Sequence, residues 1–257
     1  LVGEENKNRE KYLSLSKTYI VEILWGIETD TYDLLGRVSS EKELHCHSLQ
    51  ELYTFHILDY QNVQGLAKVL WHFLTRADGN PCLVNTGLDP RLRGNDPDSK
   101  LPDIEKLSSV LKTFVGKYKQ KYPPYSSKTV GGIPLWKWSR DGKLGEIEIP
   151  EKEVEVYSAK VLGEETILKK NLEEKIIEKI QMVSGDFRQK EITKNWQDFF
   201  ADTKRKDFLI SKIEIGCGSG VYMRSLAHAL GEKFGCGAVA YSIKRTRVGE
   251  EQYKGLV

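Results

Sequence analysis

The chain has 257 residues, of which 39% are hydrophobic and 30% charged, so it can bury a sizeable core in one large domain or two small ones. It carries 39 Lys and Arg residues against 37 Asp and Glu residues. A net charge of +2 gives little overall attraction for nucleic acid, which would need basic residues gathered on one face. It contains no run of roughly 18 apolar residues, and we therefore expect no membrane-spanning helix.

The first half of the chain predicts a strand and, much later, a helix. Residues 1–40 are expected to give a tail and then a long strand, in which one face carries Tyr19, Val21, Ile23 and Trp25. The regular pattern stops over residues 41–100, where we expect an insertion or a disordered segment. A helical stripe then follows, made of Ile104, Leu107, Val110, Leu111 and Phe114.

The second half begins with an extended segment after Pro123 and Pro124 and a turn at Gly131 and Gly132. A strand is predicted around Val154, Val156 and Ser158. The helix after it carries Leu172, Ile176, Ile177, Ile180 and Val183. Together with residues 195–200, this helix forms an excursion before the final strand.

Cysteine and histidine residues give little support for a metal site. His45, Cys46 and His47 suggest zinc, but neighbouring residues on a strand point to opposite faces and no second ligand pair is well spaced. The chain has four cysteines without dense or paired spacing, which fits a reduced cytoplasm. We expect no metal.

Two basic clusters are candidates for contacting nucleic acid. The first combines three lysines with two tyrosines and comprises Lys117, Tyr118, Lys119, Lys121 and Tyr122. The second comprises Lys244, Arg245 and Arg247. A solvated charged face is an equally good interpretation of the first cluster.

The most informative segment is KDFLISKIEIGCGSGVYMRSLAHALGEKFGCG, at residues 206–237. Its first part alternates like a half-buried strand, with Ile213 and Ile215 on one face. Three closely spaced glycines follow, and Leu226, Leu230 and Phe234 then recur at helical spacing. The segment is therefore a strand, a glycine turn and a helix.

One interpretation of EIGCGSG is the cofactor loop of an S-adenosylmethionine-dependent methyltransferase, in which a glycine turn brings backbone close to the cofactor. In such folds the turn follows the first strand of the sheet, and an acidic residue lies roughly 20 residues later. Only 37 residues follow Gly220, and the segment around Ala240 has no acidic residue at a strand end. This interpretation is therefore the weaker one.

The same segment, followed by IKRTRVG, resembles the C-terminal part of the catalytic domain of bacterial TruB-family tRNA pseudouridine synthases. KTYIVEILWGIETDTYDLLGRV, at residues 17–38, resembles the family's K-x-Y strand and its G-x-x-T-D-T-x-D-x-x-G motif. LKTFVGKYKQKYPPYSSKTVGGIPLWKWSRDGK, at residues 111–143, resembles its F-x-G and PP-x-S-x-K block. Three matches in one order carry far more weight than any single match.

This resemblance implies an α+β pseudouridine synthase fold, with a mixed, mostly antiparallel central sheet flanked by helices and interrupted by an insertion. The implied enzyme is an isomerase that converts uridine to pseudouridine at position 55 in the T arm of tRNA, by base flipping and an aspartate nucleophile, without a cofactor. We expect a cytoplasmic monomer whose partner is tRNA.

The nucleophilic aspartate of the family lies in a G-x-LDP-x-A-x-G segment before the K-x-Y strand. That segment is absent from this sequence, and we expect residues 1–257 to be a partial catalytic domain, inactive alone and without the C-terminal RNA-binding domain of many relatives. Asp89, in NTGLDPRLRGND, imitates the motif but follows the strand and lies in a polar segment typical of loops, so we do not assign it as the nucleophile. A catalytically dead RNA-binding remnant or the unstable product of a decaying gene remain alternatives.

The resemblance also implies roles for individual residues. Tyr19 matches the tyrosine that stacks on the uracil and is placed to take a proton from the sugar, although a core strand tyrosine is the alternative. Arg224 matches the arginine that pairs with the catalytic aspartate, and its place in the first turn of a helix opposes the helix dipole. Residues expected to contact RNA or to line the uracil pocket are Lys17, Asp33, Lys128, Ile243, Lys244 and Arg245. Asp30 is equally well explained as a turn residue, and Trp136 and Trp138 as packing residues with RNA stacking as the alternative.

Overall fold

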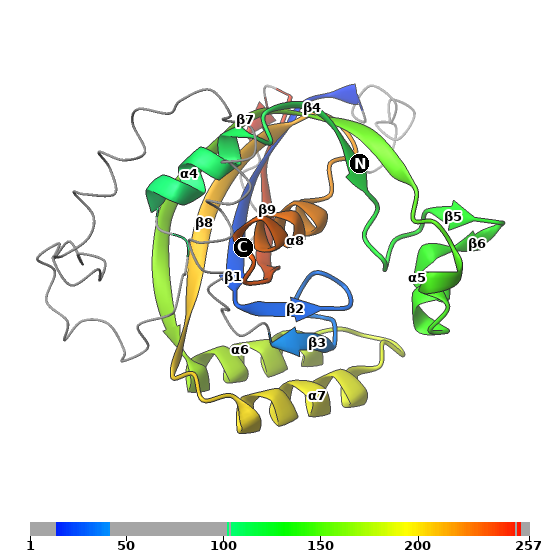
Figure 1. Ribbon diagram of the computed structural model, residues 1–257, viewed down its shortest axis with the longest axis vertical. Helices are drawn as coiled ribbons and strands as arrows, with labels where there is room; N and C mark the ends of the chain where they lie inside the picture. The colour runs from blue at the N-terminus through cyan, green and yellow to red at the C-terminus, as the bar shows by residue number, and fades with distance from the viewer. Residues whose placement is uncertain (1–13, 42–101, 103, 250, 253–257) are drawn as a thin grey trace, which may run out of the picture. The chain divides into compact units, whose positions relative to one another are not determined.

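The computed structural model describes residues 14–41, 102, 104–249 and 251–252, and it centres on a six-stranded sheet (Figure 1). The order across the sheet is β10 (Glu251–Gln252), β9 (Ala238–Val248), β1 (Lys17–Trp25), β8 (Asp207–Cys217), β7 (Glu151–Leu168) and β4 (Gly116–Lys121). All neighbouring strands in it are antiparallel. With its flanking helices, the sheet confirms the α+β class and the mostly antiparallel arrangement.

One face of the sheet is covered by α4 (Ile104–Lys112) and α8 (Met223–Phe234) (Figure 1). The strand face with Val21, Ile23 and Trp25 packs here, as the alternation in β1 predicts, and Tyr19 lies at its margin. Helix α8 approaches the sheet closely, because a Cβ atom on Gly231 would collide with the backbone nitrogen of Ala238. This core fixes α8 against β9 and β1.

The opposite face is covered, at the end where β1 finishes and β8 begins, by α6 (Lys169–Gln181) and α7 (Gln189–Asp202). Trp196 is fully buried in this second core and stacks against Phe200. The hairpin of β2 (Ile27–Thr29) and β3 (Val38–Glu41) is attached to α7 by two hydrogen bonds. The Trp196 indole donates to the carbonyl of Gly36 at 3.0 Å, and Asn195 Oδ1 accepts from the Val38 amide at 2.6 Å. The predicted excursion is therefore a helical hairpin that supports β2–β3.

The segment between β4 and β7 forms a small unit of its own (Figure 1). It consists of β5 (Thr129–Val130), β6 (Ile133–Pro134), α5 (Leu135–Arg140) and the 3₁₀ turn η3 (Leu144–Glu146). The turn predicted at Gly131 and Gly132 is present, with φ of +59° and +80°.

Helix α4 differs from its prediction in one respect. Leu107 and Leu111 are buried, and Phe114 is buried just beyond the helix end, but Ile104 is 48% exposed because α4 meets the core only from Leu107 onward. Val183 likewise lies beyond the end of α6.

The insertion predicted for residues 41–100 falls, except for residue 41, outside the described residues, as do His45, Cys46, His47 and Asp89. None of the helices that the structure describes is long and apolar enough to cross a membrane.

Candidate active site

Arg224 lies in the first turn of α8 and joins three segments that are far apart in the sequence. Its Nη1 donates to the carbonyl of Thr31 at 2.9 Å and to Asp33 Oδ2 at 3.2 Å. Its Nη2 donates to the carbonyl of Tyr125 at 3.1 Å. The side chains of Arg224 and Asp33 are 23% and 22% exposed, so the ion pair is largely shielded from water. The arginine predicted from the third motif therefore meets the aspartate predicted from the first.

The start of α8, which carries Arg224, is fixed from the sheet edge. Gln120 of β4 is buried, and its Oε1 accepts from the Tyr222 amide at 2.8 Å. Its Nε2 donates to the carbonyl of Tyr222 at 3.1 Å. The hydroxyl of Ser225 also bonds to the carbonyl of Lys121, at 3.1 Å. These bonds satisfy backbone groups where the helix begins and hold Arg224 in place.

Asp33 is also tied to its own turn. Its Oδ1 accepts from the Thr31 hydroxyl at 2.6 Å and from the Leu35 amide at 3.0 Å. The Thr29 hydroxyl bonds to its carbonyl at 2.7 Å, and Tyr32 between them has a left-handed φ of +65°. Such local side-chain bonds are why Asp and Thr stabilise tight turns. One carboxylate oxygen of Asp33 shapes the turn, and the other faces Arg224.

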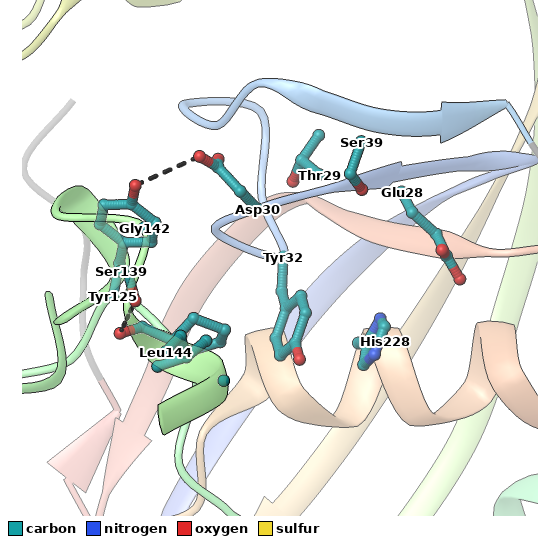
Figure 2. Close-up of a pocket in the computed structure, with 12 residues that line it drawn as sticks. Glu28, Thr29, Asp30, Tyr32, Ser39, Tyr125, Ser139, Gly142, Leu144 and His228 are labelled. Carbon is teal, nitrogen blue, oxygen red and sulfur yellow. Dashed lines mark hydrogen bonds between the residues drawn. The ribbon is translucent and has the colours of Figure 1, made fainter. Parts of the chain in front are cut away.

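Asp30, at the other end of this turn, has a separate set of partners. Its Oδ2 accepts from the Tyr125 hydroxyl at 3.2 Å, shown by the dashed line in Figure 2, and from Arg188 Nη1 at 3.4 Å. Its Oδ1 accepts from the backbone amide of Arg37 at 2.8 Å. Burial first, and then the charge of Asp30, raise the pKa of the Tyr125 phenol. Asp30 is thus a turn residue that also binds a tyrosine and an arginine.

A cavity of about 280 Å³ lies beside this turn (Figure 2). Tyr32 stacks on His228 of α8 within it, with ring centroids 3.8 Å apart. Burial, and then the charges of Glu232 and Glu28, raise the pKa of Tyr32 to about 12. Asp30 and Tyr125 line the same cavity, so its wall combines carboxylates with aromatic rings.

A second group of predicted residues gathers where β1 and β9 pair. Tyr19 lies opposite Arg245, whose Nε donates to the Tyr19 hydroxyl at 3.1 Å and whose guanidinium lies 5.3 Å from the ring centroid. Lys17 is buried, and its Nζ donates to the carbonyl of Leu15 at 2.6 Å. Burial lowers the pKa of the Lys17 ammonium, and the nearby charge of Arg245 lowers it further. Ile243, opposite Val21, is 43% exposed on the same face.

The other two predicted residues lie apart from these groups. Lys244 follows Ile243 along β9, so its side chain leaves the opposite face of the sheet. Lys128 precedes β5, and its Nζ lies 5.7 Å from the centroid of the Tyr122 ring. The structure thus places Arg224 in contact with Asp33, and Lys17 and Tyr19 near Arg245. Lys128 and Lys244 lie outside both of these groups.

The lysines of the first basic cluster face acidic residues across the sheet edge. Lys117, Lys119 and Lys121 are exposed on β4. Their partners in β7 are, in the same order, Glu155, Glu153 and Glu151. Opposite charges in register stabilise a strand pair and cancel each other's field at a distance. This arrangement favours a solvated charged face over a nucleic-acid site.

The glycine turn does not have the setting of a cofactor loop. It follows β8, which pairs antiparallel with both β1 and β7, whereas doubly wound nucleotide-binding sheets are mostly parallel. Within the residues that the structure describes, no group of three or more His, Cys, Asp or Glu side chains is placed to hold a metal ion. Trp138 donates to the carbonyl of Val130 at 3.2 Å and packs, whereas Trp136 is 42% exposed.

Part of the chain is similar to proteins of a known family. Residues 93–176 match the model described as TruB family pseudouridylate synthase (N terminal domain). This part of the chain is therefore similar to the TruB family. The tRNA pseudouridine synthase B of Thermosipho melanesiensis is 32% identical over 152 residues, which cover 59% of this chain and 35% of that protein. The tRNA pseudouridine synthase B of Borreliella afzelii is 24% identical over 249 residues, which cover 97% of this chain and 54% of that protein.

The chain thus spans between about a third and about a half of the length of these relatives. A structural similarity was also found to a chain from a crystal structure of a Cbf5-Nop10-Gar1 complex, at 14% sequence identity and a TM-score of 0.34. That match covers 93% of this chain and 33% of the other.

Sequence reasoning missed several residues that complete this site. Tyr125 stands in the quoted PP-x-S-x-K block, and its position directly after two prolines was the available signal. Thr31 contributes a backbone carbonyl, which any residue type supplies. Arg188 and His228 belong to no motif, and only the folded chain reveals their contacts.

Proposed function

We propose that residues 1–257 form part of the catalytic domain of a pseudouridine synthase that acts on uridine 55 in the T arm of tRNA. The observation that carries the proposal is the meeting of Arg224 with Asp33, because these residues come from two motifs of the family that lie far apart in the chain. The similarity to the family model and the names of the relatives support the same activity.

The reaction breaks the bond between C1′ and N1 of uridine and forms a bond between C1′ and C5. The proton on C5 leaves, N1 gains one, and no electrons are exchanged with another molecule. The base must leave the helical stack. The site must supply a carboxylate nucleophile, a cation that keeps it ionised, a ring that stacks on the uracil and a general base. We assign the cation to Arg224, the ring to Tyr19, and the general base, which takes a proton from the sugar, to the Tyr19 hydroxyl.

The hydrogen bonds of Arg224 support the first assignment. A guanidinium has five N–H groups, and three of them have partners within the described part of the chain. The other two suit a further carboxylate, and a bidentate pair would fix its orientation and lower its pKa. Asp33 then shares the guanidinium with the nucleophile, which the family resemblance puts in a segment before the K-x-Y strand.

The Arg245–Tyr19 contact supports the second assignment. The hydrogen bond from Arg245 Nε holds the Tyr19 hydroxyl at the margin of the core, and the exposed Ile243 adds apolar surface on the same face. Lys17, Asp33, Lys128, Ile243, Lys244 and Arg245 are proposed to contact the RNA. Because Lys244 and Lys128 lie apart from the other groups, we assign them to phosphates some distance from the reacting uridine.

The test uses the full gene product that contains this chain, together with any residues encoded before Leu1, and a T-arm stem-loop labelled with tritium at C5 of uridine. Tritium release reports loss of the C5 proton. We expect Tyr19→Phe and Arg224→Met to lower the rate by about a hundredfold or more while RNA binding changes little. Arg37→Met, which alters an exposed arginine of β2–β3, is the matched control.

Full activity in Tyr19→Phe or Arg224→Met would show that the site is assigned wrongly. Binding of the stem-loop by the wild-type protein without tritium release would instead identify an RNA-binding protein that does not react.

A further inference from the structure

Arg188 connects the α6–α7 hairpin to the turn that holds Asp30 and Asp33. It precedes α7 and has a left-handed φ of +59°, a backbone conformation that residues other than glycine rarely adopt. The described residues include one other non-glycine residue with positive φ, and that residue is Tyr32 in the same turn. The Arg188 side chain reaches Asp30, two residues before Tyr32, so an ion pair joins the two segments that have these uncommon conformations. Residues in such conformations cluster at functional sites.

The Arg188 side chain is 15% exposed and contacts two groups of the site. Its Nη1 lies 3.4 Å from Asp30 Oδ2, and its guanidinium lies 4.8 Å from the centroid of the Tyr125 ring. The Tyr125 hydroxyl donates to the same carboxylate oxygen at 3.2 Å. Cation, ring and carboxylate thus contact one another, so removal of the cation would loosen both remaining partners.

Tyr125 connects this cluster to Arg224. Its hydroxyl end bonds to Asp30, and its backbone carbonyl accepts from Arg224 Nη2 at 3.1 Å. Arg224 Nη1 bonds to the other end of the turn, at Asp33. The two arginines therefore hold the two aspartates of one turn, and Tyr125 contacts both arginines.

We propose that Arg188 is a positioning residue for Arg224, acting through Tyr125 and the Asp30–Asp33 turn. This inference rests on the proposed function, because it gives the α6–α7 hairpin a part in aligning the cation of the reaction. Without Arg188, Asp30 loses its cation and Tyr125 loses the guanidinium over its ring. The carbonyl that fixes Arg224 Nη2 is then free to shift, and a displacement of about 1 Å in a reacting group lowers rates strongly.

A purely mechanical role for Arg188 predicts a different result. Helix α7 is also attached to β2–β3 by the ion pair of Arg37 with Glu191, at 2.8 Å, and both side chains are about half exposed. Glu191→Gln removes the negative charge from that ion pair without changing a contact of Asp30, Tyr125 or Arg224. It is therefore the matched control for Arg188→Met.

The test measures kcat and KM of tritium release by the full gene product, and also the NMR signal of the Arg224 Nε–H group, assigned by its loss in Arg224→Lys. We expect Arg188→Met to lower kcat about tenfold with KM changed less than about twofold, and to shift or broaden the Arg224 signal. Glu191→Gln should change neither. Arg188→Lys, which restores a positive charge beside Asp30, should fold like the wild type and recover part of the lost kcat.

The proposal is overturned if Arg188→Met keeps the wild-type kcat and Arg224 signal, if Glu191→Gln reproduces its effects, or if Arg188→Lys recovers none of the lost rate. Failure of the proposed function gives a different pattern. The wild type would then release no tritium, while the Arg224 signal would still show whether Arg188 positions it.

Discussion

The ion pair of Arg224 with Asp33 predicts a measurable coupling energy in the absence of RNA. Arg224→Met removes one ionic hydrogen bond and two bonds to backbone carbonyls. Breaking one partner of a fully buried pair costs about 3–5 kcal/mol. Because these side chains are 23% and 22% exposed, water screens part of the interaction, and we expect Arg224→Met to cost about 2–3 kcal/mol.

A double-mutant cycle separates the pair itself from other effects of each substitution. We expect Arg224→Met and Asp33→Asn to show a coupling energy of about 1–2 kcal/mol. The pair of Arg37 with Glu191 is shorter, at 2.8 Å, but its side chains are 49% and 50% exposed. Its coupling energy should therefore be smaller, at most about 0.5–1 kcal/mol, because burial determines the strength of an ion pair more than distance does.

The assay is urea unfolding followed by tryptophan fluorescence, at low salt and at 1 M salt, where the screening length is about 3 Å. Salt should remove most of the Arg37–Glu191 coupling and leave most of the Arg224–Asp33 coupling. Equal coupling energies for the two pairs, or equal loss of both in salt, would refute the argument that Arg224 and Asp33 form a shielded pair.

Two further predictions concern packing and pH. Gly231→Ala should lower the free energy of unfolding by about 1–3 kcal/mol in thermal or urea unfolding, because its Cβ would collide with the Ala238 backbone. Gly145 has open space around it, so Gly145→Ala should change the free energy of unfolding by less than about 0.5 kcal/mol. Similar values for the two variants would contradict the close contact between helix and strand. The pKa of Tyr32 is raised to about 12, so between about pH 10 and 12 the folded protein keeps a proton that the unfolded chain has released, and stability falls as pH rises. Tyr32→Phe should make this fall shallower in unfolding curves, and an unchanged slope would exclude a buried Tyr32 phenol.

Much of the sheet could be predicted because its strands have one buried face. Val21, Ile23 and Trp25 alternate with other residues, and so do Ile213 and Ile215, so the period of two identifies both strands without knowledge of their partners. Helix α8 follows for a similar reason, since Leu226 and Leu230 are buried at helical spacing. The order in which strands pair could not be predicted in this way. The residues of β1 pair with residues of β8 and β9 that come 186 to 231 positions later, and a local pattern carries no information about such distant contacts.

The site was predictable only in part. Family motifs named Arg224 and Asp33 separately, but their contact depends on how the β2–β3 hairpin meets α8. Arg188 gave no signal at all, because an arginine in a polar stretch before a helix is ordinary until the fold places it over Tyr125. Side chains whose roles arise from long-range contacts lack a local period or motif, and these were the ones that sequence reasoning missed.

The position of Arg224 in its helix shows how a local penalty indicates a distant partner. A positive charge in the first turn of a helix opposes the helix dipole, a cost of about 0.3–1 kcal/mol at an exposed site. In α8 that charge is compensated by the carboxylate of Asp33 and by the carbonyls of Thr31 and Tyr125. These three acceptors come from two other segments, so the arginine is stable in its place only in the complete fold. A cation held in this way is already oriented before RNA binds, which is the property that the proposed reaction requires of it.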